Sequence, residues 1–456
     1  MDFLLITSLI LFTFVAIFRL DWALYIILAA LPTYLLRFNL GPIPATCLEM
    51  MIIIIFTVWF FKDKPWKRLD KSAWQGRRQK YPYHLEIIGI LLAAWAGLAV
   101  AGFDNSALGI FKAYFIEPIM LYLVIINYGR GSENKYIWPL AISAAVVSAV
   151  AIFQQITGQF IFNDFWARLS QRRVTSFYSY PNAVGLYLGP IIFLLIGLFL
   201  SYPRRTTLIK AGKKILLLLI ILASLAAIIF ARSEGALIGL IGGGFIIALL
   251  ADKPSRRVAI AAATASILVL CLYTPAWQYF EKKATLMDLS GQIRRQQWKE
   301  SFQMLEDGRL ITGAGLSNYQ EAVAPFHQEG IFVKNDDPDW YRKVVWDAEY
   351  KKQVWQPVEI YFYPHNIFLN FWSEIGLFGA LLFAWLIARY FYEAIGLLKK
   401  VERNKKMIIL GLIGAMSAVV IHGLVDVPYF KNDLSILFWL LIALIGLIKI
   451  KNKKSI

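Results

Sequence analysis

Long apolar runs alternate with short polar segments along almost the whole chain. A helix that crosses a bilayer needs about 20 mostly apolar residues, and runs close to that length recur from one end of the sequence to the other. They lie at residues 3–18, 22–36, 43–61, 85–102, 107–127, 136–157, 181–201, 214–231, 235–251, 257–275, 366–388, 407–424 and 433–449. The first two runs are short and separated only by residues 19–21, so the pattern predicts an all-α membrane protein with twelve or thirteen transmembrane helices.

The composition agrees with a multi-pass membrane protein. Of the 456 residues 58% are hydrophobic and 17% are charged, whereas soluble domains carry about a quarter charged residues. The 15 Trp, 22 Tyr and 32 Phe are enough to line two water–lipid interfaces. Cys47 and Cys271 both lie inside apolar runs, and the four histidines have no paired Cys/His spacing, so we expect neither a disulfide framework nor a metal centre. The first apolar run lacks a basic start and a small-residue cleavage site, so no cleavable signal is expected.

The net charge of +17 is unevenly distributed, and it indicates topology rather than nucleic-acid binding. Lys and Arg gather in segments 62–84, 202–214 and 389–406 and in the tail, and short loops rich in these residues stay in the cytoplasm. Counting back from the tail places the slightly acidic segment 276–365 outside. We therefore expect an N-terminal helix bundle (1–275), a folded external cap (276–365), and C-terminal helices with a basic cytoplasmic tail (366–456). The protein would lie in the plasma membrane, with the cap on its periplasmic or extracellular side.

One part of the cap has the pattern of an amphipathic helix. Over residues 293–306, Arg294, Trp298, Phe302 and Leu305 recur at helical spacing and share one face. Arg295 falls about 100° round the helix. We expect Arg294 to point inward with the aromatic residues and Arg295 to point to solvent.

Four external stretches carry polar residues that suit one kind of chemistry. Arg173 precedes a span opened by Asn182, Arg232 lies in a short turn between two spans, Arg294 lies in the cap, and His365 ends the cap at the membrane boundary. Arginine stays charged and grips phosphate oxygens in a planar fork, and imidazole accepts a proton near neutral pH. If the four stretches meet, they form a site for a membrane-anchored diphosphate and a group that must lose a proton.

Each of these residues also has a structural interpretation. His365 could anchor or cap the start of a helix, and Asn366 could be its N-cap. Glu374 lies two turns into the span, where packing against a helix partner is as plausible as chemistry. Arg232 could extend to lipid headgroups, and Arg294 could bind a headgroup or form a salt bridge within the loop.

Two further pairs have structural interpretations as the default. His422 and Asp426 lie at i and i+4 at an external helix end and could hydrogen-bond. Lys112 and Glu117 lie within a span, where a buried ion pair or the lining of a polar cavity is expected. His327, in the cap, is a weaker alternative to His365 as a base.

Five blocks of sequence, in this order and spacing, resemble the O-antigen ligase and O-antigen polymerase family of bacterial membrane glycosyltransferases. The blocks are RRVTSFYSYPNAVGLYL, ARSEGALIGLIGG, RRQQWKESFQMLEDGRLITGAGLSNYQ, PHNIFLNFWSEIGLFGALLF and HGLVDVPYF. The resemblance covers roughly residues 85–449. It implies a glycosyltransferase C-like enzyme of many helices, with a large external loop over a lateral cavity, that uses a glycan on undecaprenyl diphosphate without a metal.

The resemblance also assigns roles to particular residues. The family's arginine in the turn before a small-residue helix falls on Arg232, its loop arginine falls on Arg294, and its histidine after the long loop falls on His365. Arg173 matches an arginine that precedes a Gly-x-Phe-x-His-Pro-Asn pattern. Here that stretch reads SFYSYPN, with Ser176 and Tyr180 in place of the Gly and the His, so this chain lacks the pattern's histidine. Glu234 stands where a Gly is common.

The hypothesis drawn from the sequence is therefore lipid-linked glycan transfer. His365, Arg294 and Arg232 would act in catalysis, and Arg173, Asn182, Asn366, Asp426 and His422 would bind substrate. No metal or other cofactor is expected. The partners would be the undecaprenyl-diphosphate-linked donor, a glycan, lipid or protein acceptor, and membrane lipids, with no nucleic acid. Polymerisation on the same carrier, transport of a lipid-linked sugar, and a non-catalytic scaffold role remain the alternatives, although no hydropathy repeat of a transporter is evident.

Overall fold

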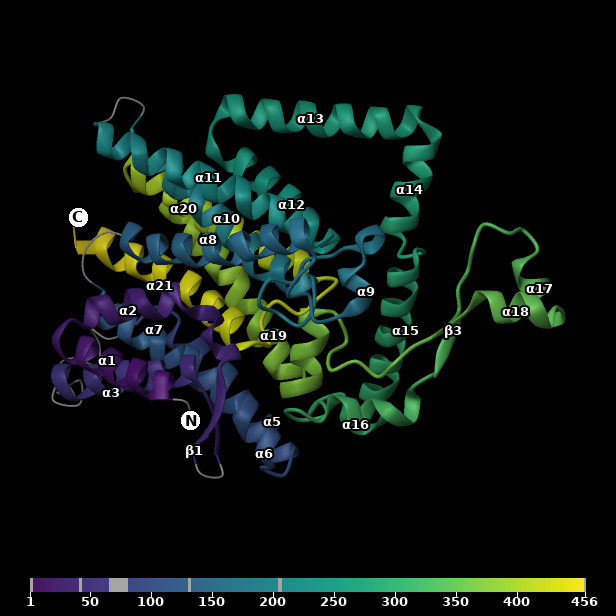
Figure 1. Ribbon diagram of the computed structural model, residues 1–456, viewed down its shortest axis with the longest axis horizontal. Helices are drawn as coiled ribbons and strands as arrows, with labels where there is room; N and C mark the ends of the chain where they lie inside the picture. The colour runs from purple at the N-terminus through teal and green to yellow at the C-terminus, as the bar shows by residue number, and fades with distance from the viewer. Residues whose placement is uncertain (1–2, 41–42, 65–80, 130–132, 204–206, 455–456) are drawn as a thin grey trace.

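The computed structural model describes residues 3–40, 43–64, 81–129, 133–203 and 207–454. Long helices run roughly parallel across the view in Figure 1, with the C-terminus at one end and α14, α15 and a projecting arm at the other. The N-terminal part contains α1 (Phe3–Phe18), α2 (Leu20–Ala29), the 3-10 helix η1 (Leu31–Leu35), the hairpin strands β1 (Arg37–Leu40) and β2 (Ile43–Thr46), α3 (Cys47–Asp63), α5 (His84–Val100), α6 (Asn105–Ile110), the π-helical turn η3 (Phe111–Ile116), α7 (Glu117–Tyr128) and α8 (Asn134–Thr157).

The second part of the bundle follows a short connecting segment. That segment holds α9 (Asp164–Ala167) and η4 (Leu169–Gln171), and the helices after it are α10 (Asn182–Ser201), α11 (Leu208–Phe230), α12 (Glu234–Ala251) and α13 (Lys253–Leu272). The chain returns to the bundle after residue 366 with α19 (Ile367–Leu397), α20 (Arg403–Gly423) and α21 (Asn432–Lys454). Each of the thirteen apolar runs overlaps helix, but residues 43–46 form a strand, and the run 22–36 divides into α2 and the 3-10 helix η1. In the described part of the chain, eight helices are long and apolar enough to span a membrane, and α1, α2 and α5 are shorter apolar helices.

Glycines let three helices of the bundle approach closely. α20 packs against both α10 and α12. A Cβ atom on Gly197 of α10 would lie 2.9 Å from the Cα of Gly411 in α20, and one on Gly243 of α12 would lie 2.7 Å from the Phe193 ring. Small residues are the usual means of close helix packing in membranes, so the run of small residues after the 231–233 turn has the packing role that its sequence suggests.

Residues 273–365 form the part of the chain between α13 and α19. It contains α14 (Thr274–Ala284), α15 (Leu289–Met304), the π-helical turn η5 (Leu305–Arg309), α16 (Tyr319–Val323), η6 (Ala324–Phe326), and an arm of β3 (Gly330–Phe332), α17 (Trp340–Trp346), α18 (Ala348–Val354) and β4 (Trp355–Pro357). β3 and β4 pair antiparallel, with Ile331 opposite Gln356.

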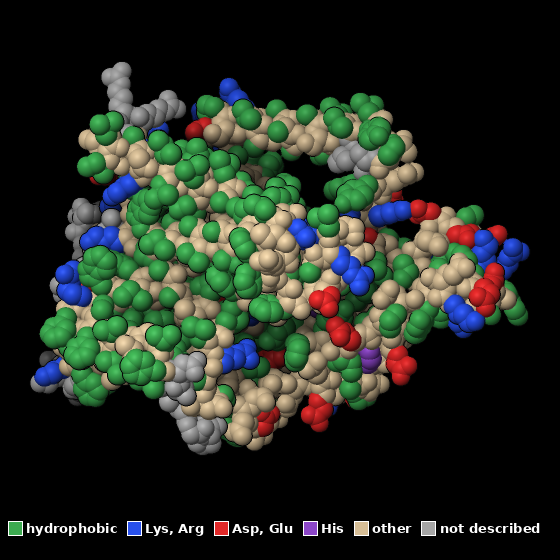
Figure 2. Space-filling view, in the orientation of Figure 1, with side chains coloured by type: hydrophobic (Ala, Val, Ile, Leu, Met, Phe, Trp, Pro, Cys, Tyr) green, Lys and Arg blue, Asp and Glu red, His purple; other side chains and the backbone are tan. Residues whose placement is uncertain are grey.

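The surface charges separate along the helix direction. Figure 2 shows Lys and Arg side chains along the end of the molecule where the C-terminus lies, and acidic side chains gathered toward the opposite end, around the arm. Between them the visible surface is mostly apolar. The same view shows an opening between α13 and the bundle, bounded by α14.

Candidate functional site

The turn between α11 and α12 is held by Arg173. The Arg173 Nε donates to the carbonyl oxygen of Ala231 at 3.0 Å, and its Nη2 donates to Asn182 Oδ1 at 3.1 Å and to the carbonyl oxygen of Arg232 at 3.3 Å. Burial and the neighbouring Arg232 lower the pKa of Arg173, and Glu234 raises it. The guanidinium of Arg173 is therefore used to shape the turn, which makes it a positioning group rather than a free phosphate ligand.

Arg232 itself is presented outward by that turn. Its backbone has a φ of 50°, in the left-handed region that non-glycine residues rarely adopt. The residue is exposed, and no described residue accepts a hydrogen bond or forms an ion pair with its guanidinium. The turn thus holds Arg232 at the start of α12, where no described residue pairs with its guanidinium.

Asn182 connects this turn to the other side of the bundle. Its Nδ2 donates to Asp426 Oδ2 at 3.4 Å, while its Oδ1 accepts from Arg173. Asp426 Oδ2 lies 3.9 Å from Nε2 of His422, which is within ion-pair range but too long for a hydrogen bond. Arg173, Asn182, Asp426 and His422 therefore form one polar chain that links the turn between α11 and α12 to the start of α10 and the end of α20.

α15 supplies the next group of site residues. Arg294 is half-buried and Arg295 is exposed, as the helical face predicts. The Arg294 Nε is buried and has no hydrogen-bond partner among the described residues. The Trp298 Nε1 donates to the carbonyl oxygen of Pro364 at 2.7 Å. Phe302 departs from the prediction, because it stays partly exposed and packs edge-on against the ring of Trp372.

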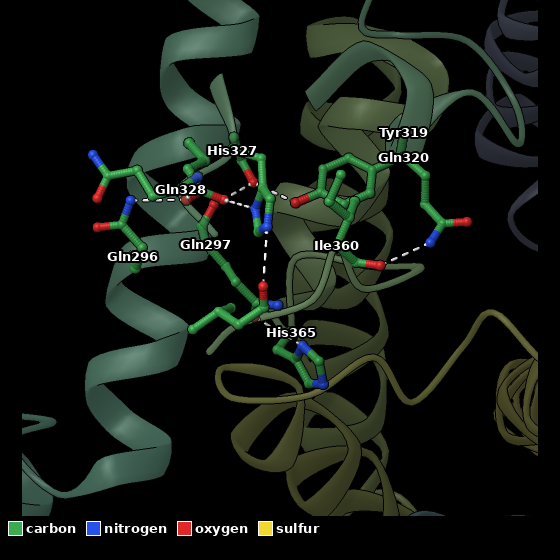
Figure 3. Close-up of polar contacts among 11 residues, drawn as sticks. Gln296, Gln297, Tyr319, Gln320, His327, Gln328, Ile360 and His365 are labelled. Carbon is green, nitrogen blue, oxygen red and sulfur yellow. Dashed lines mark hydrogen bonds and ion pairs between the residues drawn. The ribbon is translucent and has the colours of Figure 1, made fainter. Parts of the chain in front are cut away.

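His365 lies where α15 meets the start of α19 (Figure 3). Its Nδ1 is 3.0 Å from Oε1 of Gln297, and its ring is T-shaped against Tyr361 with centroids 5.0 Å apart. Because an amide oxygen only accepts, Nδ1 carries the proton and Nε2 keeps its lone pair. Burial lowers the pKa of His365, the carboxylate of Asp426 raises it, and the guanidinium of Arg294 lowers it. The charges of Asp426 and Arg294 therefore both act on His365, in opposite directions.

The neighbours of His365 have structural roles. The Asn366 side chain accepts from the backbone N–H groups of Phe368 and Leu369, and its Nδ2 donates to the carbonyl oxygen of Leu424 at 3.1 Å. Asn366 is thus the N-cap of α19. Glu374 accepts from the backbone N–H of Ser317 at 2.8 Å, which fastens the cap to α19 before a kink at residues 375–376.

His327 is held by the fold of the cap. Its Nδ1 lies 3.2 Å from Glu300 Oε2 and its Nε2 lies 3.0 Å from the carbonyl oxygen of Val358 (Figure 3). Both ring nitrogens are thereby engaged. The interpretation of Lys112 and Glu117 as a pair was wrong, because Lys112 pairs with Glu49 at 2.6 Å across the bundle.

An ion pair joins the cap to the turn that carries Arg232. Lys283, in α14, lies 2.6 Å from Glu234 Oε2 and 2.9 Å from Asp288 Oδ2. Glu234 begins α12 and Asp288 precedes α15, so one lysine ties the start of both helices together. This lysine therefore links the turn that carries Arg232 to the segment just before α15, the helix that carries Arg294.

Some partners of the predicted site residues were not predicted from the sequence. Gln297 was not recognised, although it lies three residues after Arg294 and one before Trp298, next to the predicted inner face. Lys283, at the end of α14, and Lys431, in a loop, were missed as well, because a single lysine carries no local signal of its partners. Among the described residues, no group of three or more His, Cys, Asp or Glu side chains is arranged to hold a metal ion.

Comparison with known proteins gives one match. Residues 217–384 match the sequence profile described as O-antigen ligase. The matched segment contains Arg232, Arg294 and His365, and it ends before His422 and Asp426. No curated protein matches the chain.

Proposed function

We propose that this member of the O-antigen ligase family transfers a glycan from an undecaprenyl-diphosphate carrier to an acceptor hydroxyl at the external face of the plasma membrane. The proposal rests on two groups: a guanidinium without a described partner and an imidazole whose orientation is fixed. Arg294 has a buried Nε without a partner, and His365 is fixed by Gln297 with Nε2 free. Transfer of a sugar from a diphosphate to a hydroxyl needs both groups: a cation that stabilises the diphosphate as it leaves and a base that takes the proton of the hydroxyl.

The reaction divides between the arginines and the histidine. The acceptor oxygen forms a bond to the anomeric carbon of the donor sugar, and the bond from that carbon to the diphosphate oxygen breaks, with the electron pair leaving on the diphosphate. Arg232 and Arg294 stabilise the charge that develops on the leaving group, an effect worth several kcal/mol at preorganised sites. Nε2 of His365 takes the proton of the acceptor hydroxyl, which typically contributes about 10²–10⁴-fold. The reaction as proposed uses no metal or other cofactor.

The other predicted residues support this site from a distance. Arg173 and Asn182 position the turn of Arg232, and Asn366 positions His365 by capping α19. Asp426 favours the protonated imidazole of His365 and so helps it to hold the proton it has taken. His422 remains a proposed substrate-binding residue through its place beside Asp426.

The arrangement of the chain suits a carrier that arrives through the lipid. The opening between α13 and the bundle (Figure 2) offers a lateral entry toward the start of α12. Residues 276–365 would form the external cap over the site, 1–275 and 366–456 would supply the membrane bundle, and the basic end of the molecule would face the cytoplasm.

Reconstitution tests the proposal directly. The full-length protein in proteoliposomes receives a glycan on undecaprenyl diphosphate and a candidate acceptor, and turnover is compared for wild type, Arg294→Ala and His365→Ala. We expect losses of about 10²-fold or more in each variant. Full turnover in both variants would reject the assignment. Arg294→Lys separates the planar fork from a simple point charge.

Ligation and polymerisation differ in their products. A ligase moves one chain to a different acceptor and yields a single shift on a gel, whereas a polymerase on the same carrier yields a ladder of repeat units. The same reconstitution distinguishes them by product length.

A further inference from the structure

A lysine outside the segments discussed so far lies beside the site without an anionic partner. Lys431 is the last residue of the loop between α20 and α21 and is half-buried. Its Nζ lies 4.0 Å from the ring centroid of Tyr180 and 5.6 Å from that of Tyr178. No described carboxylate lies within 4.0 Å of this ammonium, and no described atom accepts a hydrogen bond from it. Aromatic faces stabilise a cation only in part.

The charges around Lys431 make its position costly without a ligand. Burial lowers the pKa of Lys431 to about 8, the carboxylates of Asp433 and Asp426 raise it, and Arg37 lowers it. With Tyr178 and Tyr180, these are the titratable groups that face its ammonium. A half-buried ammonium with no paired anion is unfavourable. An anionic ligand would therefore stabilise the ammonium of Lys431, which the described protein groups do only in part.

Lys431 is connected to the candidate site through the segment of Tyr180. Asn182, two residues after Tyr180, donates to Asp426, and the same Asp426 affects the pKa of both Lys431 and His365. Arg173, which the sequence suggested as a phosphate ligand, has its guanidinium bound to protein acceptors. The cations of this region without a described anionic partner therefore include Arg232, Arg294 and Lys431.

We propose that Lys431 is a third substrate-binding cation, whose ammonium binds an anionic oxygen of the lipid-linked diphosphate. It would take the role that the sequence suggested for Arg173, whose guanidinium already donates to protein acceptors. This inference rests on the proposed function, since it assumes that the diphosphate is bound at this site. It assigns a residue outside the segment that matches the family profile.

Binding measurements on the intact protein in nanodiscs test the assignment. The probes are undecaprenyl diphosphate and undecaprenol, which differ only in the anionic group. We expect Lys431→Met to weaken binding of the diphosphate about tenfold and to leave undecaprenol unchanged, and Lys431→Arg to bind it nearly as well as wild type. Lys334→Met is the matched control, because Lys334 also lies over a tyrosine ring, that of Tyr341 at 4.9 Å, but in the exposed arm.

The pH dependence separates a ligand from a structural lysine. Because the ammonium loses its proton as the pH rises through about 8, diphosphate affinity of the wild type should fall between pH 7 and pH 9. Arginine stays charged over that range, so Lys431→Arg should not show this fall. If Lys431→Met does not fold, the pH dependence of diphosphate binding in Lys431→Arg still tests the proposal.

The outcomes distinguish this inference from the function on which it rests. Loss of diphosphate binding in Arg294→Ala, together with wild-type binding in Lys431→Met, would overturn the role of Lys431 and leave the proposed function standing. Equal weakening for diphosphate and undecaprenol in Lys431→Met would also overturn it, because the lysine would then be structural. A wild-type protein that binds the two lipids equally would overturn both.

Discussion

The Nδ1–H of His365 donates to Oε1 of Gln297 at 3.0 Å, and this bond joins the start of α19 to the middle of α15. His365 itself has a φ of 47°, so its backbone is held in a conformation that a histidine rarely adopts. The bond fixes both the ring orientation and the tautomer. Nε2 is thereby available as the proton acceptor.

Replacing Gln297 tests whether this orientation matters. Gln297→Leu removes the acceptor for Nδ1–H while keeping a side chain of similar size. We expect kcat to fall about tenfold or more with little change in KM, because the ring then samples the wrong tautomer. The measurement is steady-state turnover in proteoliposomes, and an unchanged kcat would mean that Gln297 does not orient the base.

Gln297→Glu gives a prediction with a definite sign. Burial lowers the pKa of His365 below its ordinary value, so the imidazole is neutral at pH 7 and loses its capacity as a base only as the pH falls through that lowered pKa. A carboxylate at position 297 favours the imidazolium and raises the pKa of His365. The acidic limb of the kcat/KM profile should therefore move to higher pH in Gln297→Glu, and a limb that moves to lower pH would contradict the assignment.

Arg173 and Arg232 should respond differently to the same substitution. Arg173→Ala removes three hydrogen bonds to the turn, so we expect both a loss of stability of about 2 kcal/mol and a loss of turnover. Arg232→Ala removes an exposed side chain, so we expect lost turnover with an unchanged melting temperature. Thermal unfolding in detergent together with turnover separates them. A stable Arg173→Ala protein that lacks only donor affinity would make Arg173 a ligand after all.

The periodicity of the sequence was sufficient for most helices of the bundle and for the inner face of α15. Apolar runs located every long helix, and the 3.6-residue spacing correctly separated inward Arg294 from solvated Arg295. The role of Arg173 could not be found in this way, because two of its three acceptors are backbone carbonyls in a turn 58 and 59 residues away, which any sequence would supply.

The pairing of charges was less predictable than the helices. Lys112 and Glu117 lie close in sequence, yet η3 is a π-helical turn, and Lys112 pairs with Glu49 of a different helix. Contacts such as that of His365 with Gln297 depend on how the cap folds back on the bundle, which local spacing does not encode.

Two glycines of α12 provide a matched test of close packing beside the site. A Cβ atom on Gly235 would lie 2.5 Å from Cδ2 and 2.7 Å from Nε2 of His422, whereas one on Gly244 would meet nothing within 4 Å. We expect Gly235→Ala to cost about 1–3 kcal/mol through overpacking and to displace His422 from Asp426. Gly244→Ala should be neutral or slightly stabilising, because alanine favours helix. Melting temperatures of the two variants measure this, and equal values would contradict the contact with His422.

Lys283 should affect the site through competition between charges. In the native protein it holds the carboxylate of Glu234, two residues after Arg232. Lys283→Met frees that carboxylate to compete with the diphosphate for Arg232, so we expect KM for the donor to rise a few-fold, in line with the roughly 0.2–1 kcal/mol of exposed ion pairs.

The double variant Lys283→Met/Glu234→Gln should return KM toward the wild-type value, because the competing charge is gone. Lys282→Met is the control, since Lys282 pairs with the exposed Asp336 in the arm, and it should leave KM unchanged. If the double variant is as impaired as Lys283→Met alone, the lysine acts by anchoring the cap at the start of α12, and the competition argument is wrong. Because exposed charges are screened within about 10 Å at 0.1 M ionic strength, the KM difference between wild type and Lys283→Met should also shrink at high salt.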